Sequence, residues 1–156
     1  MLEKSKLEQI LREWSYWDKE PQKSIFRSLL KNNISLTPDL VLVIQGVRRC
    51  GKSTLLSQMM KYKNLPSKAC TFVNFEDPRL SQDLNADLLD QIVSFSKEKF
   101  QNQKIYYFFL DEIQNVTEWE KWLHKKVERP SNEIYIITGS NASLLSGELS
   151  TALTGS

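Results

Sequence analysis

Four short apolar runs, separated by stretches with helical spacing, dominate the pattern of hydrophobic and polar positions. The runs lie near residues 41–45, 71–75, 105–110 and 134–138. Mostly apolar runs of this length are typical of parallel strands that are buried on both faces. The stretches near 84–100 and 119–127 space their apolar residues as amphipathic helices do, and Asp83 is the candidate cap of the first. Alternating strands and helices predict a three-layer α/β fold with a mostly parallel sheet.

The first part of the chain, residues 1–39, carries helical rather than strand patterns. One apolar face between about residues 3 and 17 is formed by Leu7, Ile10, Leu11, Trp14 and Trp17. A second short helix is expected near residues 25–30. We therefore expect a helical segment, 1–39, packed on a nucleotide-binding core, 40–156. Trp17 and Ile25 are candidates to cover an adenine ring, and the alternative is that these side chains pack on the sheet.

A glycine-bounded loop follows the first apolar run and precedes a helical stretch. It reads Gly46-Val47-Arg48-Arg49-Cys50-Gly51-Lys52-Ser53 and matches the phosphate-loop pattern G-x-x-x-x-G-K-[ST]. Glycines let several backbone N–H groups converge on one phosphate, and the next helix adds the positive end of its dipole. Lys52 is expected to reach the terminal phosphates, and the Ser53 hydroxyl to ligate Mg²⁺. We predict that residues 46–53 and Thr54 bind the nucleotide; the alternative is a glycine turn without a ligand.

Two adjacent acids, Asp111 and Glu112, end the most apolar run of the sequence. The carboxyl ends of parallel strands form the edge at which open α/β sheets bind ligands. Asp111 is therefore predicted to position Mg²⁺, directly or through a water, and Glu112 to polarise the water that attacks the γ-phosphate. The alternative is a strand that ends at a solvated surface. The preceding phosphate loop favours the catalytic interpretation.

The fourth apolar run ends in small polar residues, Thr138-Gly139-Ser140-Asn141. Asn141 is the first candidate to contact the γ-phosphate or the attacking water, with Ser140 or Thr138 behind it. A polar turn, or Asn141 as a helix cap, is the alternative. The predicted catalytic residues are thus Lys52, Glu112 and Asn141, and the predicted cofactors are ATP and Mg²⁺.

Composition narrows the functional classes. The chain has 156 residues, enough for one domain, and 21 basic against 19 acidic residues give a net charge of +2. This balance predicts no strong electrostatic attraction to nucleic acid or to a membrane surface. Two cysteines and a single histidine, His124, give little support for a disulfide framework, a zinc site or a histidine-centred triad. Without a signal peptide or a membrane-length apolar stretch, a cytoplasmic location is expected.

Taken in order, these motifs resemble those of AAA-type P-loop ATPases. More narrowly, the chain is similar to a family of bacterial and archaeal ATPases that have an N-terminal AAA-type domain and a C-terminal domain of unknown function. The resemblance covers about residues 40–155 and is carried by segments 46–56, 75–80, 110–114, 137–142 and 149–155. It implies the roles given above for Lys52, Ser53, Asp111, Glu112 and Asn141. It also implies the spatial strand order 5-1-4-3-2.

The sequence departs from this family in two ways. Ser156 stands where the family usually has an arginine after the final Thr-Gly, and the family's fifth strand, lid segment and C-terminal domain are missing. Without a fifth strand, the strand at 41–45 becomes a sheet edge. We therefore expect a fragment or an excised domain, whose longer form could assemble as a homo-oligomer or engage an effector.

The sequence thus predicts ATP binding with Mg²⁺-dependent hydrolysis. The alternative is a nucleotide-dependent switch or binding module with little or no hydrolysis. A small-molecule kinase is a third interpretation, but it would need an acceptor pocket and a lid, and Glu112 beside Asp111 favours water activation. Arg48 and Arg49 form a tight basic pair that is expected to neutralise phosphate or face solvent rather than bind DNA, so nucleic acid is a possible partner that this chain does not support.

Overall fold

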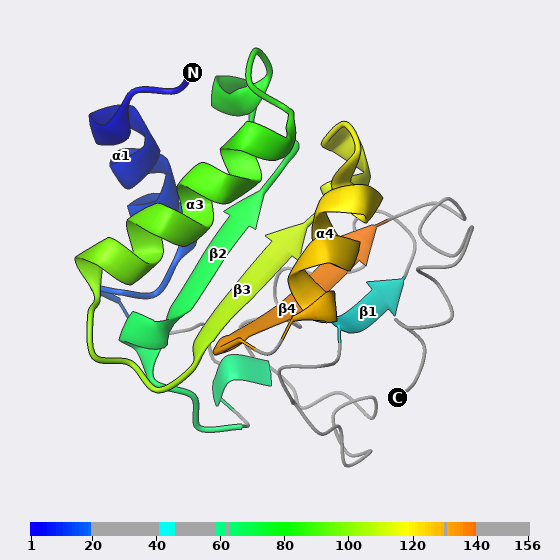
Figure 1. The fold of residues 1–156 in the computed structure, drawn as a ribbon. Coiled ribbons are helices and arrows are strands. Elements are labelled where there is room, and N and C mark those ends of the chain that lie inside the picture. The colour runs from blue at the N-terminus through cyan, green and yellow to red at the C-terminus, as the bar shows by residue number, and fades with distance from the viewer. Residues whose placement is uncertain (20–40, 46–58, 62, 130, 140–156) are drawn as a thin grey trace.

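The computed structural model describes residues 1–19, 41–45, 59–61, 63–129 and 131–139. In this part of the chain, four parallel strands form one sheet in the order β1-β4-β3-β2 (Figure 1). The strands are β1 (Val41–Gln45), β2 (Cys70–Asn74), β3 (Tyr106–Asp111) and β4 (Glu133–Gly139). The predicted α/β class and the implied order of these strands are confirmed. Among the described strands, β1 lies at one edge of the sheet, next to β4.

The helices of the described part agree with the sequence pattern, with shifted ends. They are α1 (Lys4–Trp14), α3 (Ala86–Lys99) and α4 (Trp119–Glu128), with short 3₁₀ helices η2 (Ser67–Ala69), η3 (Pro78–Leu80) and η4 (Ile113–Asn115). Residues 59–61 are also helical. None of the helices in the described ranges has the length and apolar character needed to cross a membrane. The predicted helix near 25–30 lies outside the described residues.

Both faces of the sheet are covered, because side chains alternate between two apolar clusters. Val73, Phe108 and Tyr135 point into the larger cluster, together with apolar residues of α1, α3 and α4. On the opposite face, Phe72 and Phe109 stack with ring centroids 4.2 Å apart and pack in a second cluster that contains helical residues Met59 and Met60. In Figure 1, α3 and α4 lie in front of the sheet and α1 lies beside α3. The fold is therefore the expected three-layer arrangement.

The first helix ends at Trp14, three residues before the predicted end. Ser15 is extended, with φ −83° and ψ 171°, and its hydroxyl accepts a hydrogen bond of 2.9 Å from the Phe72 N–H. The chain thus leaves the helix in order to dock on β2. Trp17 is 3% exposed, and its indole N–H donates to the Cys70 carbonyl at 2.9 Å. This packing at the start of β2 fits the second alternative for Trp17, and Ile25 lies outside the described residues.

The predicted cap of the helix near residue 84 is wrong. The helix starts at Ala86, and the Asn85 side chain caps it by accepting from the Leu88 N–H at 3.1 Å. Leu84 cannot belong to the helix, because its carbonyl accepts from both the N–H and the hydroxyl of Thr117, at 3.1 and 2.6 Å. That tertiary contact shifts the helix start to the next residue with a suitable side chain.

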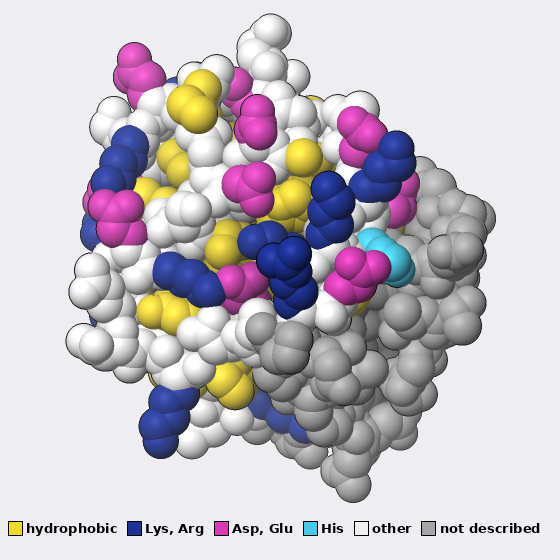
Figure 2. All heavy atoms as spheres, in the orientation of Figure 1, with side chains coloured by type: hydrophobic (Ala, Val, Ile, Leu, Met, Phe, Trp, Pro, Cys, Tyr) yellow, Lys and Arg dark blue, Asp and Glu magenta, His cyan; other side chains and the backbone are white. Residues whose placement is uncertain are grey.

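The surface over α3 and α4 carries interspersed charges. Figure 2 shows Lys and Arg side chains lying between Asp and Glu side chains on this face. His124 is exposed, with its Nδ1 3.2 Å from Glu128 Oε1. The visible face therefore has no continuous field of one sign, in agreement with the near-balanced composition.

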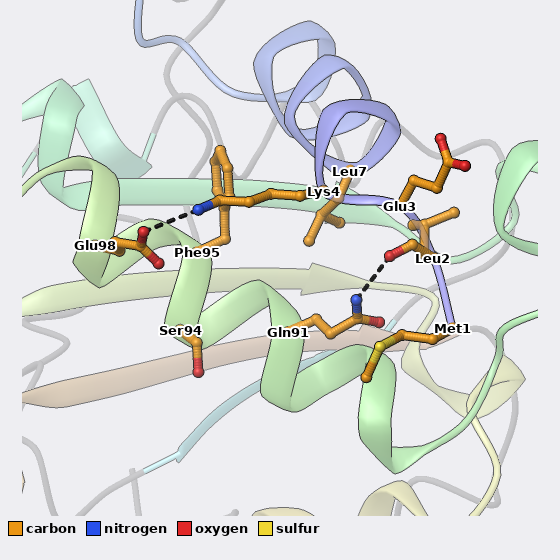
Figure 3. A pocket seen from close by; sticks show the side chains of 9 residues that line it. All are labelled: Met1, Leu2, Glu3, Lys4, Leu7, Gln91, Ser94, Phe95 and Glu98. Atoms are coloured by element: carbon orange, nitrogen blue, oxygen red, sulfur yellow. Dashed lines mark hydrogen bonds and ion pairs between the residues drawn. The ribbon is translucent and has the colours of Figure 1, made fainter.

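The N-terminus lies against α3 and forms one wall of a surface pocket. Gln91 donates from its side chain to the Leu2 carbonyl at 2.9 Å, and Lys4 pairs with Glu98 at 2.8 Å (Figure 3). Leu7 and Phe95 contribute apolar lining to this pocket of about 460 Å³. These contacts bind the first helix to the core, while the proposed boundary near residue 39 stays a prediction.

A buried aspartate fastens α1 to the end of β2. Asp77 is 8% exposed and accepts from the Trp14 indole N–H at 2.9 Å and from Arg79 Nη2 at 2.7 Å. Arg79 also reaches Glu13 of α1, at 3.0 Å. The hydrogen bonds from the Arg79 side chain outweigh the opposing effect of burial and lower the pKa of Asp77 to about 2. The ionised carboxylate is therefore a structural contact between the N-terminal helix and the sheet.

We expect Asp77→Asn to reduce the free energy of unfolding at pH 7 by about 1–2 kcal/mol. Because the folded pKa lies below the ordinary 3.8, this stabilisation is complete above about pH 5 and is lost as the pH falls toward 2. Urea unfolding at several pH values measures it. The control is Glu98→Gln, whose ion pair is exposed and should change stability by less than about 0.5 kcal/mol. A difference between parent and Asp77→Asn that stays constant from pH 7 to pH 2.5 would contradict the assignment.

Candidate functional site

The register of the strands gathers polar side chains at one edge of the sheet. Asn74 of β2 is paired with Asp111 of β3, and Leu110 is paired with Ile137, so that Asp111 lies level with Thr138. On the far side of β4, Gln45 is paired with Gly139. β1 therefore ends beside the end of β4, one residue before the predicted phosphate loop.

The carboxylate of Asp111 is held from both sides. Asp111 ends β3 and is 5% exposed. One carboxylate oxygen accepts a hydrogen bond from the Thr138 hydroxyl, and the other accepts from the Asn74 side-chain amide at 3.3 Å. Donors on both sides fix the plane of the carboxylate. The side chain predicted to position Mg²⁺ is thus preoriented by the two neighbouring strands.

The Thr138 hydroxyl has a second partner. Its oxygen accepts a hydrogen bond of 3.0 Å from the backbone N–H of Glu112. A hydroxyl has one proton to donate and lone pairs to accept, so donation to Asp111 and acceptance from Glu112 are compatible. Thr138 is fully buried, at 0% exposure, so both bonds are shielded from water. One side chain of β4 therefore fixes both acidic residues at the end of β3.

Glu112 has a left-handed backbone, which is uncommon for a residue with a Cβ. Its φ is 57° and its ψ 47°, a conformation that costs about 1–2 kcal/mol outside glycine. Its carbonyl accepts from the Asn115 side-chain amide at 3.0 Å and from the Asn115 N–H at 3.3 Å. The turn into η4 is thus held by hydrogen bonds on both sides of Glu112. Strained backbone of this kind is concentrated at functional sites.

The side chain of Glu112 is also held. It is 3% exposed, and its Oε2 accepts a hydrogen bond of 2.8 Å from the side-chain amide of Gln114. The donor comes from η4, two residues further along the chain. The carboxylate predicted to polarise water is therefore oriented by a contact within its own turn.

The donor set at this edge fits Mg²⁺. This ion prefers oxygen ligands and is usually bound by one or two carboxylates, several waters and substrate phosphates. Asp111 offers one preoriented carboxylate. Within the residues that the structure describes, no group of three or more His, Cys, Asp or Glu could hold a metal ion by itself. Among the described residues at this edge, Asp111 is therefore the one that would hold such an ion.

The predicted site residues divide into two groups. Asp111 and Glu112 lie together at the end of β3, in contact with Thr138. The predicted nucleotide-binding residues Gly46–Thr54 and the predicted phosphate contact Asn141 lie outside the described residues, so their roles stay predictions. Sequence reasoning placed Thr138 behind Asn141 and missed Asn74 and Gln114. A polar residue near the end of an apolar run, the signal that identified Asp111, is also present at Asn74.

Comparison with known families gives one match over most of the chain. The model of a family described as an AAA domain matches residues 38–156. The matched region contains every predicted catalytic, phosphate-binding and metal-binding residue, whereas Trp17 and Ile25, the candidates to cover an adenine ring, precede it. It also contains the whole described sheet.

Two curated relatives match about three quarters of the chain. An uncharacterized protein of Haemophilus influenzae is 40% identical over 121 residues, which are 75% of this chain and 29% of that protein. The uncharacterized protein MJ1544 of Methanocaldococcus jannaschii is 36% identical over 122 residues, or 78% of this chain and 26% of that protein. The chain thus spans less than a third of the length of these curated relatives.

Two solved structures are similar at much lower identity. The structure of C. elegans PCH-2 has a TM-score of 0.42 and 16% identity, over 75% of this chain and 34% of that chain. The structure of Rhizobiales Trip13 has a TM-score of 0.45 and 15% identity, over 96% of this chain and 57% of that chain.

We expect Thr138→Val to lower the free energy of unfolding by about 1–3 kcal/mol, because it leaves a buried N–H of Glu112 and a buried carboxylate without the hydroxyl. Thr138→Ser is the matched control, since it keeps the hydroxyl and loses one methyl group, worth about 0.8 kcal/mol. Urea unfolding midpoints compare the three proteins. If Thr138→Val is as stable as the parent, the hydroxyl does not hold the end of β3.

Proposed function

The chain belongs to the AAA domain family, a class of P-loop nucleotide-binding domains, and on this premise we propose that it binds Mg-ATP at the carboxyl edge of its sheet and hydrolyses it. The observation that carries the proposal is the linked pair Asp111 and Glu112, both fixed by Thr138. Gln45, which precedes the phosphate-loop motif, is in register with Gly139 beside them. The residue that precedes the phosphate-loop motif therefore lies at the same edge of the sheet as the acidic pair.

In this proposal, residues Gly46–Thr54 hold the phosphates of ATP. Their backbone N–H groups and the ammonium of Lys52 would bind the phosphate oxygens. Ser53 and Asp111 would hold Mg²⁺, which neutralises charge on the β- and γ-phosphates when bound. The hydrogen bonds from Asn74 and Thr138 support the metal role of Asp111, since they orient its carboxylate before any ligand arrives.

Hydrolysis is assigned to the neighbouring carboxylate. Glu112 would orient the attacking water and accept its proton, and Asn141 would contact the γ-phosphate or that water. The left-handed backbone at Glu112 supports this role, because strained backbone is concentrated at functional sites. In a longer form of the protein, a homo-oligomer or an effector partner would act in addition to this nucleotide site.

A nucleotide-dependent switch with little hydrolysis is the second candidate. The observation that favours it is the 3% exposure of Glu112, because a buried carboxylate has little contact with solvent water. In this alternative the output is a conformational change on binding rather than turnover. The two functions share the nucleotide site and differ in the role of Glu112.

The first test concerns binding. Lys52→Ala should weaken ATP binding by about tenfold to a hundredfold. This is the change expected for the loss of about 1.5–3 kcal/mol from a charge-assisted hydrogen bond. Titration calorimetry with Mg-ATP measures it. Lys61→Ala, which removes an exposed lysine of the helical residues 59–61, is the control and should bind like the parent. An unchanged affinity of Lys52→Ala for ATP would remove the basis of the nucleotide site.

The second test concerns turnover. Glu112→Gln should keep ATP affinity and lower the single-turnover rate of hydrolysis by about 10²–10⁴-fold, the usual contribution of a general base. Glu120→Gln on the exposed side of α4 serves as the control for charge removal. If Glu112→Gln hydrolyses ATP as fast as the parent, Glu112 is not the catalytic residue. ATP binding without turnover in the parent protein would select the switch.

A further inference from the structure

We propose that Gln114 is a positioning residue that holds the Glu112 carboxylate in the direction needed for water attack on bound ATP. This inference rests on the proposed hydrolysis. Its structural basis is the hydrogen bond of 2.8 Å from Gln114 Nε2 to Glu112 Oε2. The two side chains belong to one tight turn at the end of β3, next to Asp111.

The backbone of Glu112 is fixed before its side chain is considered. Thr138 accepts from its N–H at 3.0 Å, and Asn115 donates to its carbonyl through both a side-chain and a backbone N–H. With φ and ψ set in this way, the direction of the carboxylate depends on the side-chain torsions. A donor that binds one carboxylate oxygen restricts those torsions. Gln114 supplies such a donor.

The chemistry of an amide suits this task. A lysine or arginine in its place would form an ion pair with Glu112 and compete with water for the carboxylate. The neutral amide donates one hydrogen bond to one carboxylate oxygen and adds no charge beside it. Gln114 is half-buried in η4, so its own conformation is restricted by the same turn. The geometry thus orients the base without neutralising its charge.

The test uses steady-state hydrolysis and ATP binding by the full-length product of the gene. Gln114→Met keeps the length of the side chain and removes the donor, and Gln114→Glu replaces the donor by a second carboxylate. Both variants should lower kcat by about tenfold to a hundredfold, the range expected when a reacting group is misplaced by about 1 Å. The affinity for ATP should stay within about twofold, because the proposed role is confined to turnover. Gln101→Met, at an exposed position in the turn between α3 and β3, is the matched control and should retain full kcat.

A double-mutant cycle separates positioning from general stability. In the Glu112→Gln background, Gln114→Met should cause no further loss of kcat, because its effect passes through the Glu112 carboxylate. Equal losses in both backgrounds, or an unchanged kcat of Gln114→Met in the parent, would overturn the inference. Thermal unfolding checks that each variant is folded; if Gln114→Met is not, Gln114→Glu carries the same cycle.

Failure of the proposed function gives a different pattern. If Glu112→Gln retains the parent rate, the assignment of Glu112 as catalytic residue falls, and the positioning role falls with it. If Glu112→Gln loses turnover while both Gln114 variants retain it, the proposed function stands and the positioning role alone is overturned.

Discussion

The hydroxyl of Thr138 is the contact on which the arrangement of the acidic residues depends. Because it is buried and has one proton, donation to Asp111 leaves its oxygen to accept from the N–H of Glu112. Two strands that are adjacent in space but separated by α4 in the chain are thereby joined at their carboxyl ends. The parallel register of β3 and β4 is what brings the three groups within reach.

The left-handed turn at Glu112 follows from this contact. A non-glycine residue keeps φ 57° only where its surroundings compensate the strain. Here Thr138 satisfies the N–H of Glu112, and Asn115 satisfies its carbonyl. The turn then ends the strand and directs Gln114 back toward the Glu112 carboxylate. The direction of the proposed base is therefore a consequence of sheet register and local turn chemistry together.

The sequence predicted the parts of this structure that have local signals. Apolar runs located the four strands to within one or two residues, and the acids at the end of one run located the site edge. The partners of those acids could not be predicted, because Asn74 and Thr138 meet Asp111 only through strand pairing. The prediction of Asp83 as the helix cap was wrong for a similar reason, because a tertiary contact decides where the helix starts. Asp83 and Asn85 are both good caps by type, and the contact of Leu84 with Thr117 decides between them.

The polar residues at the end of β2 connect the candidate site to the N-terminal helix without leaving the sheet edge. The Asn74 amide donates to Asp111, while its oxygen accepts from the Glu76 N–H at 2.8 Å. The next residue, Asp77, receives the indole N–H of Trp14 from α1. Both the nitrogen and the oxygen of the Asn74 amide are thus hydrogen-bonded. These bonds fix the orientation of the amide and reduce the free-energy cost of placing it beside a carboxylate. Docking of α1 and orientation of Asp111 therefore depend on one short segment, because the same turn after β2 supplies the donor to Asp111 and the acceptor for Trp14.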